Sequence, residues 1–383
     1  MECVSYLSTK LSYRDATETA NRLFHRLPEQ EIKLRTLSDG IQRVGTEIVD
    51  TLMEETHRIL SDNGFNPETG LPLETTILSS NVTGAVDPGN PSSAYANIQK
   101  AIDRINAVRE EKIPFTAEEF QPQIEADPEH CVYISIDDIG VKRQKDSRGD
   151  GSVRDTKFVE NTNVHIQYGD FSYVITAVGM DKVFLAILAF LLQNDLLKYE
   201  LIFLTDGARD IKNRIESFFA FHPHTTILDW FHLKKKCMEL LSMGMRGKDK
   251  RNTTLEKLLR YLWVGDIPSA KQYLVSLPPS SIKNQKWINE IVSYLDRKQD
   301  TITCYAIRAE LNLRNSSNPV EKANDLLVAQ RQKHNGMAWT PNGSGTLASI
   351  QMIYQNNQAD LWFREKKILF FTESTVGDGK LCA

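Results

Sequence analysis

The chain has 383 residues, of which 41% are hydrophobic and 25% charged, a composition typical of soluble globular proteins. This length is sufficient for two or three domains with substantial cores. The longest apolar run, Val183–Leu192, is about half of what a membrane-spanning helix needs, and the N-terminus lacks the apolar segment of a secretory signal. Five scattered cysteines without a C-x-x-C pair indicate neither a disulfide framework nor a zinc site, so we expect a cytoplasmic protein without membrane association.

Charge is distributed unevenly along the chain. Residues 1–130 contain 12 basic and 22 acidic residues, whereas the remainder contains 34 and 28, for a net charge of −4 overall. The basic residues of the second part form clusters, namely VKRQKDSR, HLKKK, MRGKDKR, RQKH and REKK. Such clusters are ordinary on solvated faces, but repeated clusters also suit a surface that contacts phosphate groups.

The N-terminal region predicts two amphipathic helices, the first with Ser12 as its N-cap and the second over 36–60. This order is compatible with a helix-turn-helix DNA-binding region and equally with any small helical hairpin. Residues 61–95 are rich in Gly, Pro, Asn and Ser and predict a linker or arm, followed by one short helix.

From Cys131 onward the pattern changes to strands and alternating helices. CVYISID predicts a strand, and residues 158–179 predict two strands joined at Gly169-Asp170. The elements that follow are a buried helix over 181–195, a strand over 199–207, a helix over 208–221 and a strand over 225–229. We therefore expect an α/β fold with a mixed five-stranded sheet and helices on its faces.

After Asp229 the pattern is helical for about 80 residues, without an internal repeat. A further helix is expected with Asn318 as N-cap, Pro319 in the first turn and Glu321 closing a capping box. From Gly336 onward we expect a loop and one short helix.

Three carboxylates stand out by position: Asp137 ends the first strand, Asp206 ends the fourth, and Glu321 begins the late helix. Strand ends and helix starts face the same rim of an α/β sheet, so the three could converge there. Carboxylates hold Mg²⁺, and two ions about 3.5–4 Å apart stabilise the attacking and leaving oxygens of phosphoryl transfer. Each acid also has an ordinary explanation. Asp137 or Asp138 could cap a turn, Asp206-Gly207 is a common turn pair, and Glu321 could serve only in its capping box.

This order of elements and acids resembles the ribonuclease H-like core of DDE transposases. Four blocks are similar to those of bacterial insertion-sequence transposases of the Kra and Lre type: VYISIDDIGV, LIFLTDGARDIKN, TILDWFHLKKK and NPVEKANDLLVAQRQKHNGMAWTPNGSGTLASI. Those enzymes carry a long helical insertion between the second and third acids, and here Glu321 lies 115 positions after Asp206. The resemblance covers about residues 130–355, with a weaker match over the N-terminal helices. The chain lacks an upstream segment expected of such relatives, so we expect a truncated copy.

The resemblance implies a division of the chain into five parts. These are a helical region and candidate helix-turn-helix over 1–60, a linker or arm with a short helix over 61–130, a ribonuclease H-like catalytic core over 131–236 and 313–355, a helical insertion over 237–312, and a C-terminal tail over 356–383.

The resemblance also implies a DNA transposase in which Asp137, Asp206 and Glu321 hold two Mg²⁺ ions, with Mn²⁺ as a substitute. Water would cut a phosphodiester at an element end, and the freed 3′-hydroxyl would attack target DNA. The implied partners are element-end and target DNA and further copies of the chain, in a homodimer or larger synaptic complex. The enzyme would be nucleoid-associated in the cytoplasm and would need no small-molecule cofactor.

Relatives with an insertion carry an (Asp or Cys)-x-x-His motif after the fifth strand, which Asp229 and His232 match, and this motif would support the active site or contact DNA near it. Alternatively, Asp229 N-caps the following helix and His232 packs against it. Asp138, where relatives usually have Gly, would be an accessory carboxylate. Cys237 lacks further ligands at metal spacing, so we expect no zinc site there.

The candidate DNA contacts lie in the basic clusters and in the insertion. Some relatives use a tryptophan of the insertion to stack on a flipped base, although a tryptophan in a leucine-rich helix is more often part of the core. The candidates are Lys234, Lys235, Lys236, Arg331, Lys333 and Trp263.

Other functions are compatible with the same residues. A decayed or repurposed copy would bind element ends without catalysis, and a structure-specific nuclease would cut but not join DNA. A phosphatase-like α/β hydrolase built on FLTDG would give Glu321 no role. Excision and strand-transfer products distinguish these alternatives.

Overall fold

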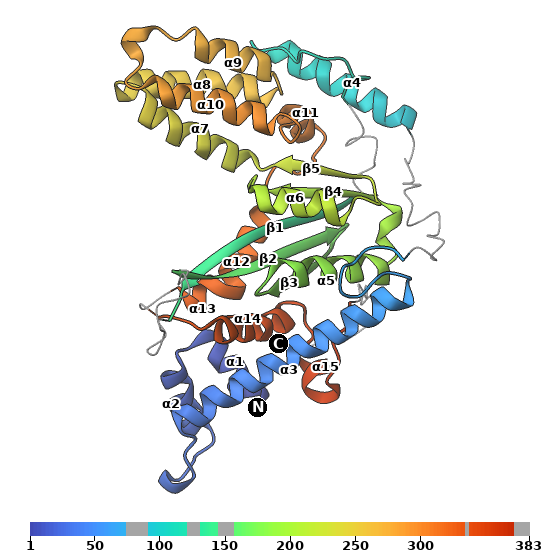
Figure 1. The fold of residues 1–383 in the computed structure, drawn as a ribbon, viewed down its shortest axis with the longest axis vertical. Helices are drawn as coiled ribbons and strands as arrows, with labels where there is room; N and C mark the ends of the chain where they lie inside the picture. Colours follow the sequence, from blue (N-terminus) through green and yellow to red (C-terminus); the bar gives the residue numbers. More distant parts are fainter. Residues whose placement is uncertain (74–90, 121–130, 145–156, 334–336, 371–383) are drawn as a thin grey trace. The chain divides into compact units, whose positions relative to one another are not determined.

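The computed structural model describes residues 1–73, 91–120, 131–144, 157–333 and 337–370 (Figure 1). It is an α/β protein whose mixed sheet has the strand order β3-β2-β1-β4-β5, with β2 and β3 antiparallel and β4 and β5 parallel. The strands are β1 (Cys131–Lys142), β2 (Phe158–Tyr168), β3 (Phe171–Ala177), β4 (Glu200–Thr205) and β5 (His224–Leu228).

The chain forms two compact units. Unit 1 contains Met1–Thr83, Ile136–Leu197 and Asn318–Ala383, and unit 2 contains Gly84–Ser135 and Lys198–Ser317. None of the helices in the described residues combines the length and apolarity needed to cross a membrane.

The hairpin expected around Gly169 is confirmed. Tyr168 of β2 pairs with Phe171 of β3, and Gly169 has a φ of +53°, a conformation that L side chains rarely adopt. Val164 and Ile166 of β2 are buried, so the hairpin turns an apolar face to the core.

β1 continues past the acidic pair that we expected to end it. Ile139 and Val141 beyond the pair are buried, so the apolar alternation extends the strand to Lys142. Asp137 and Asp138 are therefore consecutive residues inside a strand, and their side chains leave on opposite faces of the sheet.

Helices from both ends of the chain build unit 1. Ser12 is an N-cap as expected, since its Oγ accepts a hydrogen bond from the backbone N–H of Asp15 at 3.1 Å. The helical elements are α1 (Glu2–Lys10), α2 (Tyr13–Leu23), η1 (Pro28–Gln30), α3 (Leu34–Asp62), α5 (Met180–Gln193), α12 (Asn318–Asn324), the π-helical turn η5 (Asp325–Ala329), α13 (Gln330–Gln332), α14 (Pro341–Gln355) and α15 (Ala359–Glu365).

The long helix α3 packs along α14 and against α5 (Figure 1). Gly45 permits the close crossing with α14, because a Cβ at this position would lie 2.4 Å from Thr346 Cβ. Ser349 Oγ, also on α14, donates to the Gly45 carbonyl at 3.2 Å. The C-terminal region thus contains two helices rather than the one expected. Tertiary packing outweighs the weak helix propensity of the NGSGT run.

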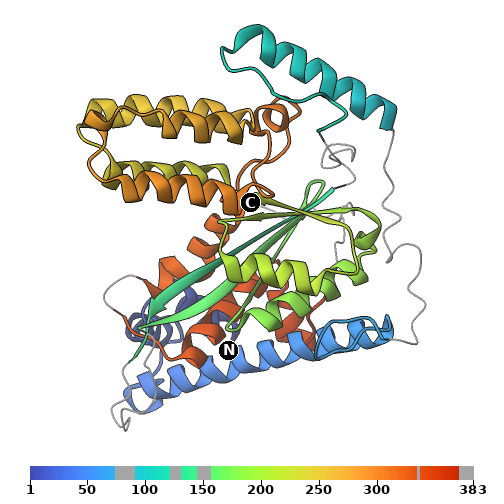
Figure 2. The same ribbon diagram turned by 45° about the horizontal axis from the view of Figure 1, so that its top comes forward.

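Unit 2 contains the helical segment expected after Asp229. Its helices are α4 (Pro91–Val108), α6 (Arg209–Phe218), α7 (Trp230–Gly244), α8 (Lys248–Trp263), α9 (Ile267–Val275), α10 (Gln285–Lys298) and α11 (Tyr305–Glu310), with a 3₁₀ turn at η4 (Pro279–Ser281). A second 3₁₀ turn, η3 (Leu196–Lys198), contains the last residues of a unit 1 segment and the first residue of a unit 2 segment. Helices α7, α8, α9 and α10 contact one another in a closed ring (Figure 2). Leu240, Leu258, Leu274 and Ile291 are buried in their shared core, which makes this segment a packed body.

Candidate active site

Asp137 on β1 is hydrogen-bonded to the helix that carries Glu321. The side-chain amide of Asn324 donates to Asp137 Oδ2 at 2.7 Å, and the backbone N–H of Asp138 donates to Asp137 Oδ1 at 2.9 Å. Glu321 precedes Asn324 by three residues, so the two side chains share one face of α12. Unit 1 therefore turns this face of α12 toward Asp137, with Glu321 exposed on it.

Asn324 lies where the helix changes geometry. It is the last residue of α12, and the π-helical turn η5 begins at the next residue. Asn324 is only 6% exposed, and its Oδ1 accepts a hydrogen bond from Asn163 Nδ2 of β2 at 2.6 Å. Short π-helical turns within helices are frequent at functional sites. One buried amide thus holds Asp137 and β2 against the helix.

Asp138 is held on the other face of β1. Its Oδ1 accepts a hydrogen bond from Thr162 Oγ1 on β2 at 2.5 Å. Asp138 thus bonds to a neighbouring strand, whereas Asp137 bonds to the helix that carries Glu321. This difference favours Asp137 as the candidate ligand.

Asn161, two residues before Asn163 on β2, belongs to another buried polar network. Asn161 Nδ2 donates to Ser344 Oγ at 2.8 Å, and Ser344 Oγ donates to Gln332 Oε1 at 2.6 Å. Trp339 Nε1 donates to the Gln332 carbonyl at 3.0 Å. These bonds tie β2, α13 and α14 together, because buried polar groups are costly unless they are paired.

Asp206 follows β4 in unit 2, in a turn that requires glycine at the next position. Gly207 has a φ of +84°, and a Cβ there would lie 2.7 Å from Leu228 Cδ1. Asp206 Oδ1 accepts a hydrogen bond from the backbone N–H of Ala208 at 2.7 Å. Asp206 therefore does serve a turn. The carboxylate still retains lone pairs for a ligand role.

Lys298, at the end of α10, lies beside this turn. Its Nζ donates to the Gly207 carbonyl at 2.6 Å. Burial lowers the pKa of Lys298, and repulsion by Lys212 acts in the same direction, whereas the Asp206 carboxylate opposes the change. A half-buried ammonium group thus accompanies Asp206.

Asp229 is fully buried and accepts hydrogen bonds from residues at the start and at the end of the helical segment of unit 2. As the N-cap of α7, its Oδ1 accepts from the His232 backbone N–H at 2.8 Å, and His232 Nδ1 lies 3.2 Å away. Its Oδ2 accepts from the Ser317 N–H at 2.6 Å and lies 3.2 Å from Ser317 Oγ. Burial raises the pKa of Asp229, but the hydrogen bonds from His232 and Ser317 outweigh it and hold the pKa below its usual value.

The side chains of the candidates His232 and Trp263 both contact neighbouring protein groups. The His232 side chain is 28% exposed and packs by its ring nitrogen against Asp229. The ring centroid of Trp263 lies 4.7 Å from that of Trp230 and 6.0 Å from that of Tyr305, and the Arg109 guanidinium lies 6.0 Å from the Trp263 ring. Trp263 therefore belongs to an aromatic cluster at the edge of the helical core.

The basic candidates fall into two groups. Lys234, Lys235 and Lys236 on α7 are exposed, and so is Lys333. Arg331 is only 5% exposed, and its Nε donates to the Ser8 carbonyl at 2.8 Å. The exposed lysines are accessible to a phosphate group. Arg331 instead links α1 to α13 through its hydrogen bond to Ser8.

The three proposed metal ligands are divided between the units, with Asp137 and Glu321 in unit 1 and Asp206 in unit 2. Across the described residues, no three His, Cys, Asp or Glu side chains gather closely enough to hold a metal ion.

No family model matches the chain, and no curated protein matches it. Among solved structures, the chain is similar to the Drosophila P element transposase strand transfer complex. The identity is 11%, the match covers 84% of this chain and 81% of that chain, and the TM-score is 0.22.

Several residues of the site were missed by the sequence analysis. Asn324 and the polar run at Asn161, Thr162 and Asn163 carried a signal, because polar side chains inside otherwise apolar elements usually belong to a buried network. Lys298 carried none, because its proximity to Asp206 depends on how α10 packs.

Proposed function

We propose that the chain is a DNA-cleaving and DNA-joining enzyme of the DDE transposase type. The observation that supports this most directly is the Asn324–Asp137 hydrogen bond, which joins the strand of the first proposed ligand to the helix of the third. The fold class and the order of the three acids along the chain are compatible with it. The exposed Lys234–Lys236 run would supply phosphate contacts.

Carboxylate oxygens are the ligands that Mg²⁺ takes, so the donor chemistry of Asp137, Asp206 and Glu321 fits the ion that we propose. Metal binding would require these three carboxylates to gather, since they do not form a three-ligand group in the described residues. When bound, the metal would lower the pKa of the attacking water and offset charge on the phosphate. The chain's own residues have supporting tasks. Asn324 would orient Asp137, Gly207 would set the turn that presents Asp206, and Lys298 would hold that turn through the Gly207 carbonyl.

The proposal is tested with a supercoiled plasmid that carries the DNA flanking the coding sequence. With Mg²⁺, the wild-type chain should nick this plasmid and yield strand-transfer products. Asp137→Asn, Asp206→Asn and Glu321→Gln should each reduce both products to background while binding of the same DNA in a mobility-shift assay is retained.

Matched controls are available for these variants. Asp210→Asn removes an exposed acid four residues after Asp206, and Asp325→Asn removes an exposed acid four residues after Glu321. Both should cleave as the wild type does. Asp138→Asn tests the choice within the acidic pair, and loss of cleavage there with retention in Asp137→Asn would reassign the ligand to Asp138.

The same experiment distinguishes the alternatives. A structure-specific nuclease would nick without joining, and an element-end binding protein would bind without nicking. Wild-type cleavage by all three carboxylate variants would refute the proposed site.

A further inference from the structure

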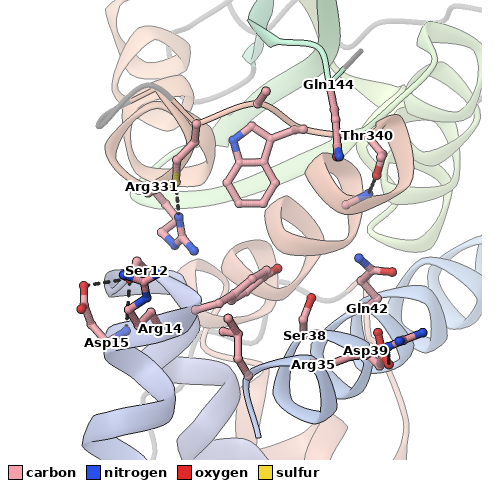
Figure 3. A pocket seen from close by; sticks show the side chains of 16 residues that line it. Ser12, Arg14, Asp15, Arg35, Ser38, Asp39, Gln42, Gln144, Arg331 and Thr340 are labelled. Carbon is pink, nitrogen blue, oxygen red and sulfur yellow. Dashed lines mark hydrogen bonds and ion pairs between the residues drawn. The ribbon is translucent and has the colours of Figure 1, made fainter. Parts of the chain in front are cut away.

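A cavity of about 830 Å³ lies in unit 1 between the starts of α2 and α3 and the segment that leads into α14 (Figure 3). Its volume is within the range of small-molecule sites. None of the proposed catalytic residues lines it, so the proposed cleavage chemistry does not account for it.

One side of the cavity is aromatic and cationic. Tyr13 and Trp339 line it, with ring centroids 6.2 Å apart in a T-shaped arrangement. The buried Arg331 guanidinium lies 5.2 Å from each ring centroid. The phenol oxygen of Tyr13 is buried and has no hydrogen-bond partner among the described residues. Buried polar atoms are normally paired, so this oxygen points to a missing partner.

Polar side chains line the cavity on both sides. Figure 3 shows Ser38 and Gln42 on one side of the cavity and Gln144 on the other. A glutamine amide offers both donors and an acceptor, which is the pattern that pairs with the edge of a nucleobase.

The cavity also has features that favour a negative charge. The first turn of α3 lines it and has neither a side-chain cap nor an acidic residue, so the partial positive charge of this helix start is available to an anion. Two carboxylates also line the cavity: Asp15, which accepts a hydrogen bond from Ser12 Oγ at 2.8 Å, and Asp39. Arg14 and Arg35 line the cavity as exposed side chains. Arg35 is only loosely paired, with its Nε 3.8 Å from Asp39 Oδ2.

We propose that this cavity binds a nucleotide. The phosphate would lie at the start of α3 between Arg14 and Arg35, and the base would lie against Tyr13 and Trp339 within reach of Gln42. The nucleotide could be free in solution or an unpaired unit of a DNA strand, since both present a phosphate next to an aromatic base. This inference goes beyond the proposed catalytic function and needs no metal.

The test is calorimetric titration of the full chain in EDTA with three kinds of probe. These are the four deoxynucleoside 5′-monophosphates, 5′-phosphorylated single-stranded hexamers, and inorganic phosphate. Binding of the monophosphates indicates a free nucleotide, and binding of the hexamers alone indicates a nucleotide within a strand. Either result supports the proposal if the variants below respond.

Arg14→Ala and Arg35→Ala should each weaken nucleotide binding about tenfold, because each removes a charged hydrogen-bond donor. Arg22→Ala on α2 and Arg43→Ala on α3 are matched controls, since both side chains are exposed on the same helices and outside the cavity. The controls should stay within about twofold of the wild type. Gln42→Ala should weaken nucleotide binding but leave phosphate binding unchanged.

Three results would overturn the proposal. The first is that neither monophosphates nor hexamers bind at millimolar concentration. The second is that the control variants weaken binding as much as Arg14→Ala and Arg35→Ala, which would indicate only general charge attraction. The third is that inorganic phosphate binds as tightly as the nucleotides. Since the binding is measured without metal, Asp206→Asn should retain it, and a failure of the catalytic proposal leaves it intact.

Discussion

Replacement of Asp229 by alanine is expected to destabilise unit 2 by about 2–4 kcal/mol. Loss of the N-cap of α7 should cost about 1 kcal/mol. The change also leaves the Ser317 N–H, which donates to Asp229 at 2.6 Å in a buried position, without its acceptor. An unsatisfied buried donor costs about 1–3 kcal/mol. The larger part of the effect thus comes from a contact between residues 88 positions apart.

Asp266→Ala is the matched control. Asp266 caps α9 by accepting from the Ser269 N–H at 2.9 Å, and it is half-buried. Its loss should cost about 1 kcal/mol, as expected of a cap alone. The measurement is urea unfolding of each variant, together with hydrogen exchange of the peptide that contains Ser317. Exchange there should increase in Asp229→Ala and not in Asp266→Ala. Equal losses in the two variants would refute the reasoning.

The lowered pKa of Asp229 gives this contribution a defined pH dependence. A carboxylate whose pKa is lower in the folded state stabilises the protein above its unfolded pKa of about 3.9, and the contribution is lost as pH falls below that value toward the folded pKa. The stability difference between the wild type and Asp229→Asn should therefore be largest at neutral pH and should decrease as the pH falls below about 4. A difference that stays constant or grows in acid would show that the charge of Asp229 is not responsible.

Three further predictions concern the other contacts. Asn324→Ala leaves Asn163 Nδ2 without its acceptor, so it should cost about 1–3 kcal/mol in urea unfolding and should also lower plasmid cleavage; an unchanged unfolding midpoint would contradict this. Arg331→Ala should cost a similar amount, because it leaves the Ser8 carbonyl unpaired; if Arg331 were only a DNA contact, stability would not change. Replacing Lys234, Lys235 and Lys236 together by alanine should lower the slope of log affinity for duplex DNA against log salt by up to about 2.7, and an unchanged slope would exclude these lysines from the interface.

The candidate site shows why a prediction from sequence reaches some residues and not others. Asp137 and Glu321 could be proposed from the sequence because each lies in a recognisable local pattern, an apolar strand and a helix start. Asn324, which joins Asp137 to the helix that carries Glu321, was not predicted, since its partner Asp137 is 187 residues away. Whether these acids bind metal stays a prediction.

The acidic pair Asp137 and Asp138 on β1 shows what a local sequence pattern does not predict. A carboxylate after an apolar run predicts the end of the strand, because ionised groups are costly to bury. In the structure Thr162 pairs with Asp138 and Asn324 pairs with Asp137, so both carboxylates are accommodated within a strand whose apolar alternation continues to Lys142. The pairing comes from neighbouring elements, which no local pattern shows.

By itself, the sequence determined the kind and order of the elements: the hairpin at Gly169, the cap at Ser12 and the helical segment after Asp229. These depend on alternation, capping and turn conformation, which act over a few residues. Only the tertiary structure decided that Arg331 is buried against Ser8, that Asp229 bonds to Ser317, and that α2, α3 and the segment before α14 enclose a cavity. Such contacts depend on which distant elements pack together, and that choice follows from burial over the whole fold.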